Sequence, residues 1–182
     1  MKHQLNLNLS EDHPAYQWAK KQSDSVNAFG HIGTHIDCYS KVPEESHYEL
    51  DFLLIDCLDG MPSASDIEDL ELENKALILY TGVLDKYGYG TKSYGETNTF
   101  LSENVLDRIL SKKPQFILID ACGIGNHGEE HIRFDQKCEQ MSCFVIENIL
   151  INSDMAMPLN KLEIIIDISS RSTGKTCKIY GY

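Results

Sequence analysis

Short apolar runs that end in polar or flexible residues constrain the folding of this chain most strongly. Three of them, residues 76–82, 116–120 and 143–149, are predicted to be buried strands. Ser102 caps a helix between two of these runs, and the apolar stripe of this helix is Leu101, Val105, Leu106, Ile109 and Leu110. Strands and helices alternate only loosely along the chain. The sequence therefore predicts one compact α/β domain over residues 1–182, with a mixed β-sheet and flanking helices.

Polar residues stand at the ends of the predicted strands. Asp120 ends the run 116–120, and Glu147 lies within the run 143–149. Open α/β sheets place their functional sites at such strand ends. The Tyr- and Gly-rich segment 85–99 is too long for a routine connection. It is predicted to be either a binding loop or a mobile surface excursion.

Two imidazoles and a carboxylate, those of His31, His35 and Asp37, lie within seven residues. Histidine and carboxylate side chains are ligands for zinc and manganese. In an extended strand, residues two and four positions apart share a face, so all three side chains could point the same way. Gly30 and Gly33 argue against a helix here. The alternative is a chance grouping of structural side chains, since the chain holds seven histidines.

Composition excludes several classes of partner. The net charge of −12 disfavours nucleic acid and anionic membranes, because both require basic patches. No apolar run is long enough to span a bilayer. The first residues lack the apolar core of a signal peptide, and the six cysteines are scattered, so we expect free thiols in a cytoplasmic protein. The expected partner is a small-molecule substrate.

The segment from His31 to Asp37 reads His-x-Gly-Thr-His-x-Asp. With this motif, the chain resembles the cyclase-like metal-dependent hydrolases that include bacterial kynurenine formamidase. Four further places agree in the same order along the chain: Tyr80-Thr81-Gly82, Asp120-Ala121, Val145-Ile146-Glu147-Asn148 and Ser172-Thr173-Gly174-Lys175-Thr176. The resemblance implies a compact swivelling β/β/α fold, one or two divalent ions, zinc or manganese, and a homo-oligomer, often a dimer.

The resemblance also implies the metal ligands. Carried over residue by residue, they are His31, His35, Asp37 and Glu147. The family has a further ligand histidine before the glutamate, and the best register places Asp135 there. His131 and His127 are close enough to replace it if the loop shifts. An aspartate at this position would favour manganese, magnesium or calcium somewhat over zinc.

This chain departs from the family at the position of the general base. Where the family has a histidine four positions after the motif aspartate, this chain has Lys41. A lysine is a poorer base at neutral pH unless its pKa is lowered. Lys41 could instead stabilise an oxyanion or bind a substrate carboxylate, and His47 could replace the base. The remaining alternative is a solvated surface lysine.

The reaction implied by the resemblance is hydrolysis of a non-peptide amide, as in an arylformamidase or a lactam hydrolase, by a water that the metal activates. Two alternatives stay open. One is a catalytically impaired relative that binds metal and a small molecule without turnover. The other is a structural protein with a vestigial site.

Overall fold

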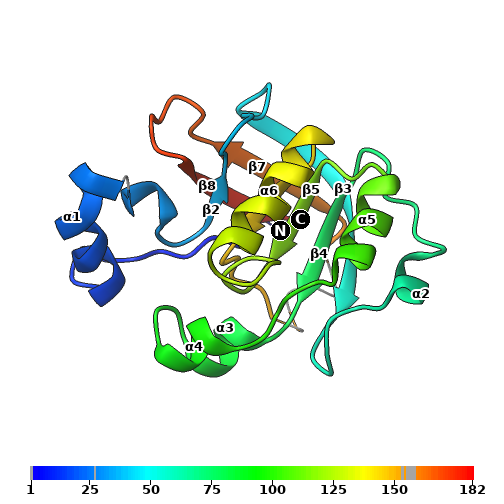
Figure 1. Cartoon of the computed structure of the whole chain (residues 1–182), viewed down its shortest axis with the longest axis horizontal. Coiled ribbons are helices and arrows are strands. Elements are labelled where there is room, and N and C mark those ends of the chain that lie inside the picture. Colours follow the sequence, from blue (N-terminus) through cyan, green and yellow to red (C-terminus); the bar gives the residue numbers. More distant parts are fainter. Residues whose placement is uncertain (1, 27, 153, 155–158) are drawn as a thin grey trace.

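The structure of the protein is a computed structural model that describes residues 2–26, 28–152, 154 and 159–182 (Figure 1). Its strands are β1 (His3–Gln4), β2 (His35–Asp37), β3 (His47–Asp56), β4 (Ala76–Tyr80), β5 (Phe116–Ile119), β6 (Phe144–Glu147), β7 (Lys161–Ile166) and β8 (Gly174–Gly181). Its helices are α1 (Pro14–Val26), the 3₁₀ helix η1 (Ala28–His31), α2 (Ala64–Ile67), α3 (Val83–Tyr87), α4 (Lys92–Glu96), α5 (Glu103–Ser111) and α6 (Glu129–Gln140). No helix among the described residues is long and apolar enough to cross a membrane.

One mixed sheet organises the domain. Its strand order is β1-β8-β2-β6-β5-β4-β3-β7, and β7 also pairs with β8, so the sheet closes on itself. Strands β3, β4, β5 and β6 run parallel, whereas β2 is antiparallel to both of its neighbours, β6 and β8. The predicted single α/β domain with a mixed sheet and flanking helices is confirmed. The closure of the sheet was not predicted.

The core has two parts, one on each face of the sheet. In β4 the alternation of a strand sends Ile78 and Tyr80 to the inside of the closed sheet, and Leu77 and Leu79 to the side of the helices. Helices α5 and α6 cover this outer face (Figure 1). Each fully buried aliphatic side chain contributes about 1.5–3 kcal/mol relative to exposure. Burial of the outer apolar cluster therefore holds α6 against the sheet.

Helix α6 differs from the prediction. The sequence is polar over residues 126–134 and predicts a helical turn or two only over 135–141, but α6 begins at Glu129. Two acidic residues in the first turn favour this start because they interact well with the helix dipole. Phe134 and Cys138, four residues apart, are fully buried against the sheet. The apolar face of α6 is therefore narrow. Most residues of the segment are polar, so its sequence gives little sign of a helix.

Two further segments differ from the expectation. The alternation of Leu5, Leu7 and Leu9 with asparagines predicts a strand, but the structure has only an isolated bridge there, between Asn6 and Ile149, and the short strand β1 comes before it. The segment 85–99 contains α4 and packs on the domain, because Tyr94 is only 2% exposed and its hydroxyl donates to Asn148 Oδ1 at 2.5 Å. The segment is thus packed on the domain, and its role as a binding loop stays a prediction.

Candidate metal centre

Strands β2 and β6 place three polar side chains on the outer face of the sheet. His35 and Asp37 alternate with Ile36, whose side chain lies in the inner core. His35 pairs directly with Glu147 across the antiparallel ladder, so these two side chains are neighbours on the same face. All three are at most 4% exposed. The expected strand geometry therefore brings His35 and Asp37 together. The expectation fails for His31, because residues 28–31, Gly30 included, form the 3₁₀ helix η1 instead of extending the strand.

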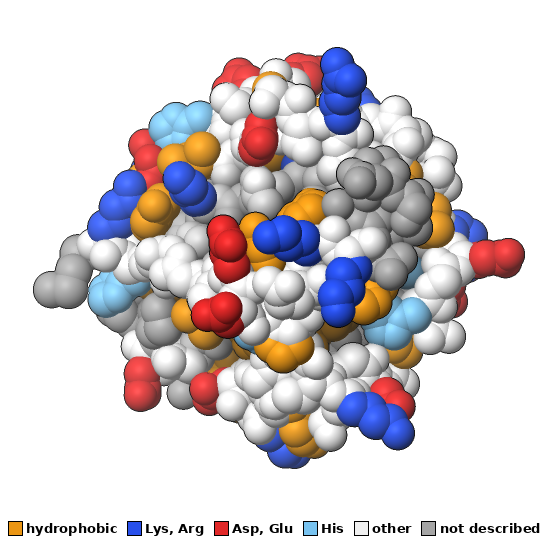
Figure 2. Space-filling view, turned by 90° about the vertical axis from the view of Figure 1, so that its left-hand side faces the viewer, with side chains coloured by type: hydrophobic (Ala, Val, Ile, Leu, Met, Phe, Trp, Pro, Cys, Tyr) orange, Lys and Arg blue, Asp and Glu red, His pale blue; other side chains and the backbone are white. Residues whose placement is uncertain are grey.

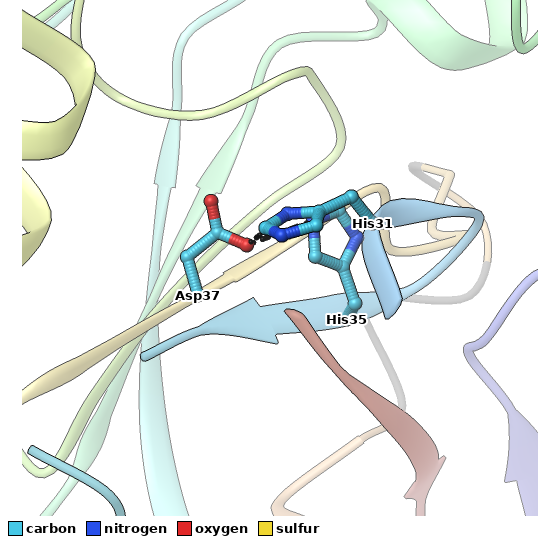
Figure 3. A group of neighbouring side chains, drawn as sticks. All are labelled: His31, His35 and Asp37. Carbon is cyan, nitrogen blue, oxygen red and sulfur yellow. Dashed lines mark ion pairs between the residues drawn. The ribbon is translucent and has the colours of Figure 1, made fainter. Parts of the chain in front are cut away.

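The first donor group consists of His31, His35 and Asp37 (Figure 3). His31 Nδ1 lies 2.9 Å from Asp37 Oδ1, and His35 Nε2 lies 3.1 Å from the same oxygen. His35 Nδ1 donates to the carbonyl oxygen of Gly33 at 2.8 Å. This bond fixes the ring so that Nε2 is the nitrogen available to an ion. His31, from η1, is held by Thr173, whose Oγ1 is 2.8 Å from Nε2.

The second donor group consists of Asp37, His131, Asp135 and Glu147. His131 Nε2 lies 3.1 Å from Asp37 Oδ2, 3.2 Å from Asp135 Oδ2 and 3.4 Å from Glu147 Oε1. His131 and Asp135 are four residues apart on α6, so they project from one face of the helix. Within each donor group the candidate ligand atoms lie within 4.8 Å of one another.

Asp37 belongs to both groups. Its Oδ1 faces the two histidines of the first group, and its Oδ2 faces His131 of the second. Three buried carboxylate oxygens at this point, Asp37 Oδ1, Asp135 Oδ2 and Glu147 Oε1, face histidine ring nitrogens at 2.9–3.4 Å but accept no well-aligned hydrogen bond. A buried carboxylate oxygen left this way is costly unless a cation satisfies it. The nitrogen and oxygen donors present fit one or two divalent ions, with Asp37 shared between them.

The protonation of the metal-free cluster follows from its excess of carboxylates. Burial raises the pKa values of Asp135 and Glu147. Burial opposes ionisation of Asp37 too, but the three histidines around it, His131, His31 and His35, hold its pKa well below its usual range. Burial disfavours the charged forms of His35 and His131, yet the hydrogen bond to Asp37 and nearby negative charges raise both pKa values to about 9. The carboxylates of the cluster therefore favour positive charge next to them, which protonated His35 and His131 supply in the metal-free protein.

Gly123, after β5, leaves room for the cluster. Its φ of +91° lies in a region that residues other than glycine rarely adopt. A Cβ atom at this position would lie 2.5 Å from Glu147 Oε1 and 2.6 Å from His131 Cε1. The glycine therefore permits both the turn at the strand end and the close approach of two candidate ligands.

A cavity of about 250 Å³ opens onto the cluster. Its remaining lining comes from loops around the sheet rim: Tyr39, Tyr89, Cys122, His127 and Asn148. Tyr89 accepts the Gly33 amide hydrogen at 2.8 Å, which ties the segment 85–99 to the motif loop. His127 is exposed at the cavity and lies 3.0 Å from the carbonyl oxygen of Gly95. The cavity is large enough for a small molecule.

The structure brings together all five residues that were expected to bind metal, and it adds His131. From the sequence, His131 was predicted only as an alternative ligand to Asp135, but helix α6 places both residues at the cluster. A helix beginning before residue 131 would have shown that the two residues share a face. His127 lies at the cavity without joining either donor group, and His47 pairs with Glu163 at 3.2 Å on strands β3 and β7.

Lys41 is not brought to the cluster. Its ammonium group donates to Ser142 Oγ at 2.6 Å, and its exposed side chain lines a separate cavity of about 230 Å³. A role as general base would therefore require the side chain to leave Ser142 and turn toward the donor groups. That role stays a prediction from the sequence.

Solved structures with the same fold span the whole chain. A potential metal-dependent hydrolase with cyclase activity matches with a TM-score of 0.69 at 14% identity, covering 100% of this chain and 96% of its own. A predicted metal-dependent hydrolase from Bacillus stearothermophilus gives 0.69 at 15% identity, covering 100% and 97%. Isatin hydrolase A from Labrenzia aggregata gives 0.67 at 12% identity, covering 100% and 93%. The fold is thus that of the cyclase-like hydrolases.

Sequence comparison agrees with the fold. The family model described as "Putative cyclase" matches residues 3–126, which is more than half of the chain and includes the His31–Asp37 motif. The protein belongs to this cyclase family. The matched segment ends before α6, the helix that carries His131 and Asp135. A comparison with curated proteins found no significant match.

Proposed function

We propose that the protein is a metal-dependent hydrolase of a non-peptide amide, such as an arylformamide or a lactam, and that it uses one or two zinc or manganese ions. The single observation that carries this proposal is the pair of donor groups joined by Asp37, in which three buried carboxylate oxygens accept no well-aligned hydrogen bond. Membership of the cyclase family supports it, as does the shared fold with isatin hydrolase A. The proposed ligands are His31, His35, Asp37, His131, Asp135 and Glu147.

Bound divalent ions would supply Lewis acidity, which polarises an amide carbonyl and makes water more acidic. The chain itself supplies placement. The Gly33 carbonyl orients His35, and α6 presents His131 and Asp135 toward the end of β6. The cavity beside the donor groups admits a small substrate, and its lining includes the aromatic side chains of Tyr39 and Tyr89, which suits an aromatic or heterocyclic amide.

The test is hydrolysis by the metal-loaded protein of a panel containing N-formylkynurenine, simple formanilides and lactams including isatin. We expect turnover of at least one class that is lost after chelation, restored by zinc or manganese, and lost in Asp37→Asn. Asp51→Asn is a matched control, since Asp51 is an exposed residue of β3. A protein that binds metal but turns over none of these amides would contradict the proposal.

The second candidate is a relative that binds metal and a small molecule without turnover. The position of Lys41 favours it, because the residue at the family's general-base position points away from the donor groups. Under this alternative, the panel gives ligand-induced stabilisation without product formation. The same experiment therefore separates the two functions.

We also propose that the protein forms a homodimer. Helix α1 packs mainly against η1, at the left of Figure 1, and leaves Trp18 60% exposed. Figure 2 shows that acidic and basic side chains are mixed on this side of the molecule, with apolar side chains exposed between them. Light scattering should give twice the mass of one chain, and Trp18→Ser should shift the equilibrium toward the monomer. A monomeric native protein would contradict this proposal.

A further inference from the structure

We propose that Tyr39 is a positioning residue of the metal centre, which fixes the shared carboxylate of Asp37, and that Glu139 holds Tyr39 in the required place. This inference rests on the proposed function, because it concerns the same donor groups. It assigns a role to a residue outside the His31–Asp37 motif, and it explains what the loop after β2 does in this chain.

The Tyr39 hydroxyl donates a hydrogen bond to Asp37 Oδ2 at 2.9 Å. Asp37 serves both donor groups only if each of its oxygens faces its own group. A donor directed at one oxygen fixes the rotation of the carboxylate about the bond that carries it. Groups that hold ligands in this way commonly change metal affinity by about 10–100-fold.

The other described side chains that contact the Asp37 carboxylate cannot hold it in the same way once an ion is bound. They are His31, His35 and His131, which approach through ring nitrogens at 2.9–3.1 Å. A ligand histidine gives the lone pair of its nitrogen to the metal, so that nitrogen no longer donates to Asp37. The phenol of Tyr39 keeps its proton and its bond to Oδ2 in both states.

Glu139 fixes the backbone on which Tyr39 sits. Glu139 is 1% exposed, and its carboxylate accepts the amide hydrogens of Tyr39 at 2.6 Å, Ser40 at 2.7 Å and Lys41 at 2.8 Å. The Ser40 hydroxyl also donates to it. Hydrogen bonds to a charged acceptor are about twice as strong as neutral ones. Three consecutive amides on one buried carboxylate therefore leave this loop little freedom.

The same clamp decides which side chain faces the cavity. Tyr39 lines the cavity at the donor groups, whereas Lys41, two residues on, bonds to Ser142 outside it. Glu139 lies on α6, two turns after His131. One helix thus supplies two candidate ligands and holds the loop that orients a third, so the loop and the ligands keep a fixed geometry relative to each other.

The test is Tyr39→Phe, which removes only the hydroxyl. Metal-free protein is titrated with zinc and with manganese, and the visible absorption spectrum of the cobalt-loaded protein is recorded. We expect an affinity about 10–100-fold lower, an altered cobalt spectrum and an unchanged melting temperature of the metal-free protein. Tyr48→Phe is the matched control, since the Tyr48 hydroxyl accepts the Glu45 amide hydrogen at 3.0 Å in a different cavity. It should bind metal as the native protein does.

Glu139→Gln tests the second link. It should also weaken metal binding, and the double variant with Tyr39→Phe should bind no more weakly than Tyr39→Phe alone, because both act through one hydrogen bond. If Tyr39→Phe binds metal with native affinity, or lowers only the melting temperature of the metal-free protein, the inference is wrong while the proposed function stands. If the native protein binds no metal, the proposed function itself fails.

Discussion

At the scale of single residues, the properties of the site come from Asp37. This carboxylate faces two donor groups, and three imidazoles surround it. The motif spacing predicted His31, His35 and Asp37 on one face of a strand, and the structure agrees for His35 and Asp37, whereas His31 reaches the cluster from the 3₁₀ helix η1. The choice between His131 and Asp135 could not be made from local sequence, because the polar residues around His131 do not show that the helix already begins at Glu129. Their assignment as ligands remains the proposal that metal analysis must test.

Gly123→Ala provides a residue-scale prediction. The positive φ and the steric conflict with Glu147 and His131 should destabilise the metal-free protein by about 1–3 kcal/mol and weaken metal binding at least tenfold, about 1.4 kcal/mol. Urea denaturation and metal titration measure the two effects. Gly95→Ala is the control, because a Cβ there meets nothing within 4 Å. Native metal affinity in Gly123→Ala would show that the two ligands do not need this space.

At the scale of elements, strand positions were the most predictable part. The runs around β4, β5 and β6 are short, apolar and fully buried, so local composition was sufficient to identify them. The orientation of the loop after β2 was not predictable. Its direction is set by Glu139, about a hundred residues away in the sequence, and not by residues 38–41 themselves. The position of Lys41 follows from this long-range contact.

Helix α6 carries an element-scale prediction. Phe134 is 1% exposed between α6 and the sheet, so Phe134→Ala should destabilise the metal-free protein by about 3–5 kcal/mol. Ile132→Ala, on the exposed side of the same helix at 39% exposure, should cost less than about 1 kcal/mol. Chemical denaturation compares the two variants. Equal losses of stability would mean that α6 is not held to the sheet by this face.

At the scale of the whole molecule, the sequence predicted the fold class but not the closure of the sheet. Closure depends on β7 pairing with both β3 and β8, which requires the register of three strands to agree. Apolar periodicity shows that a strand exists but carries no information about its partners. The closed sheet matters for function because it fixes β2 between β6 and β8, and so fixes the motif.

Linkage between protons and metal is a property of the whole protein. The pKa values of His35 and His131 in the metal-free protein are about 9, so both rings are protonated at pH 7. Metal binding requires neutral imidazoles, so ions should release protons and bind more tightly as the pH rises toward 9. Titration calorimetry in buffers of different ionisation enthalpy measures this release. Metal binding without proton release at pH 7 would contradict the proposed ligands.

The same shifts predict how pH affects stability. A histidine pKa raised from about 6.5 to about 9 stabilises the metal-free fold fully below pH 6.5, and this contribution is lost as the pH rises through 9. The metal-free protein should therefore become less stable between these pH values. The metal-loaded protein should not follow the same trend, because its imidazoles are already neutral.

The metal content and melting temperature of the purified protein, measured beside His35→Ala, test the central claim most directly. We predict one or two divalent ions per native chain and a melting temperature that rises on metal addition, since a ligand that binds the folded state stabilises it. His35→Ala should hold less metal and gain less stability from it. Equal metal content and equal melting in the two proteins would show that the metal centre is not built on the His31–Asp37 motif.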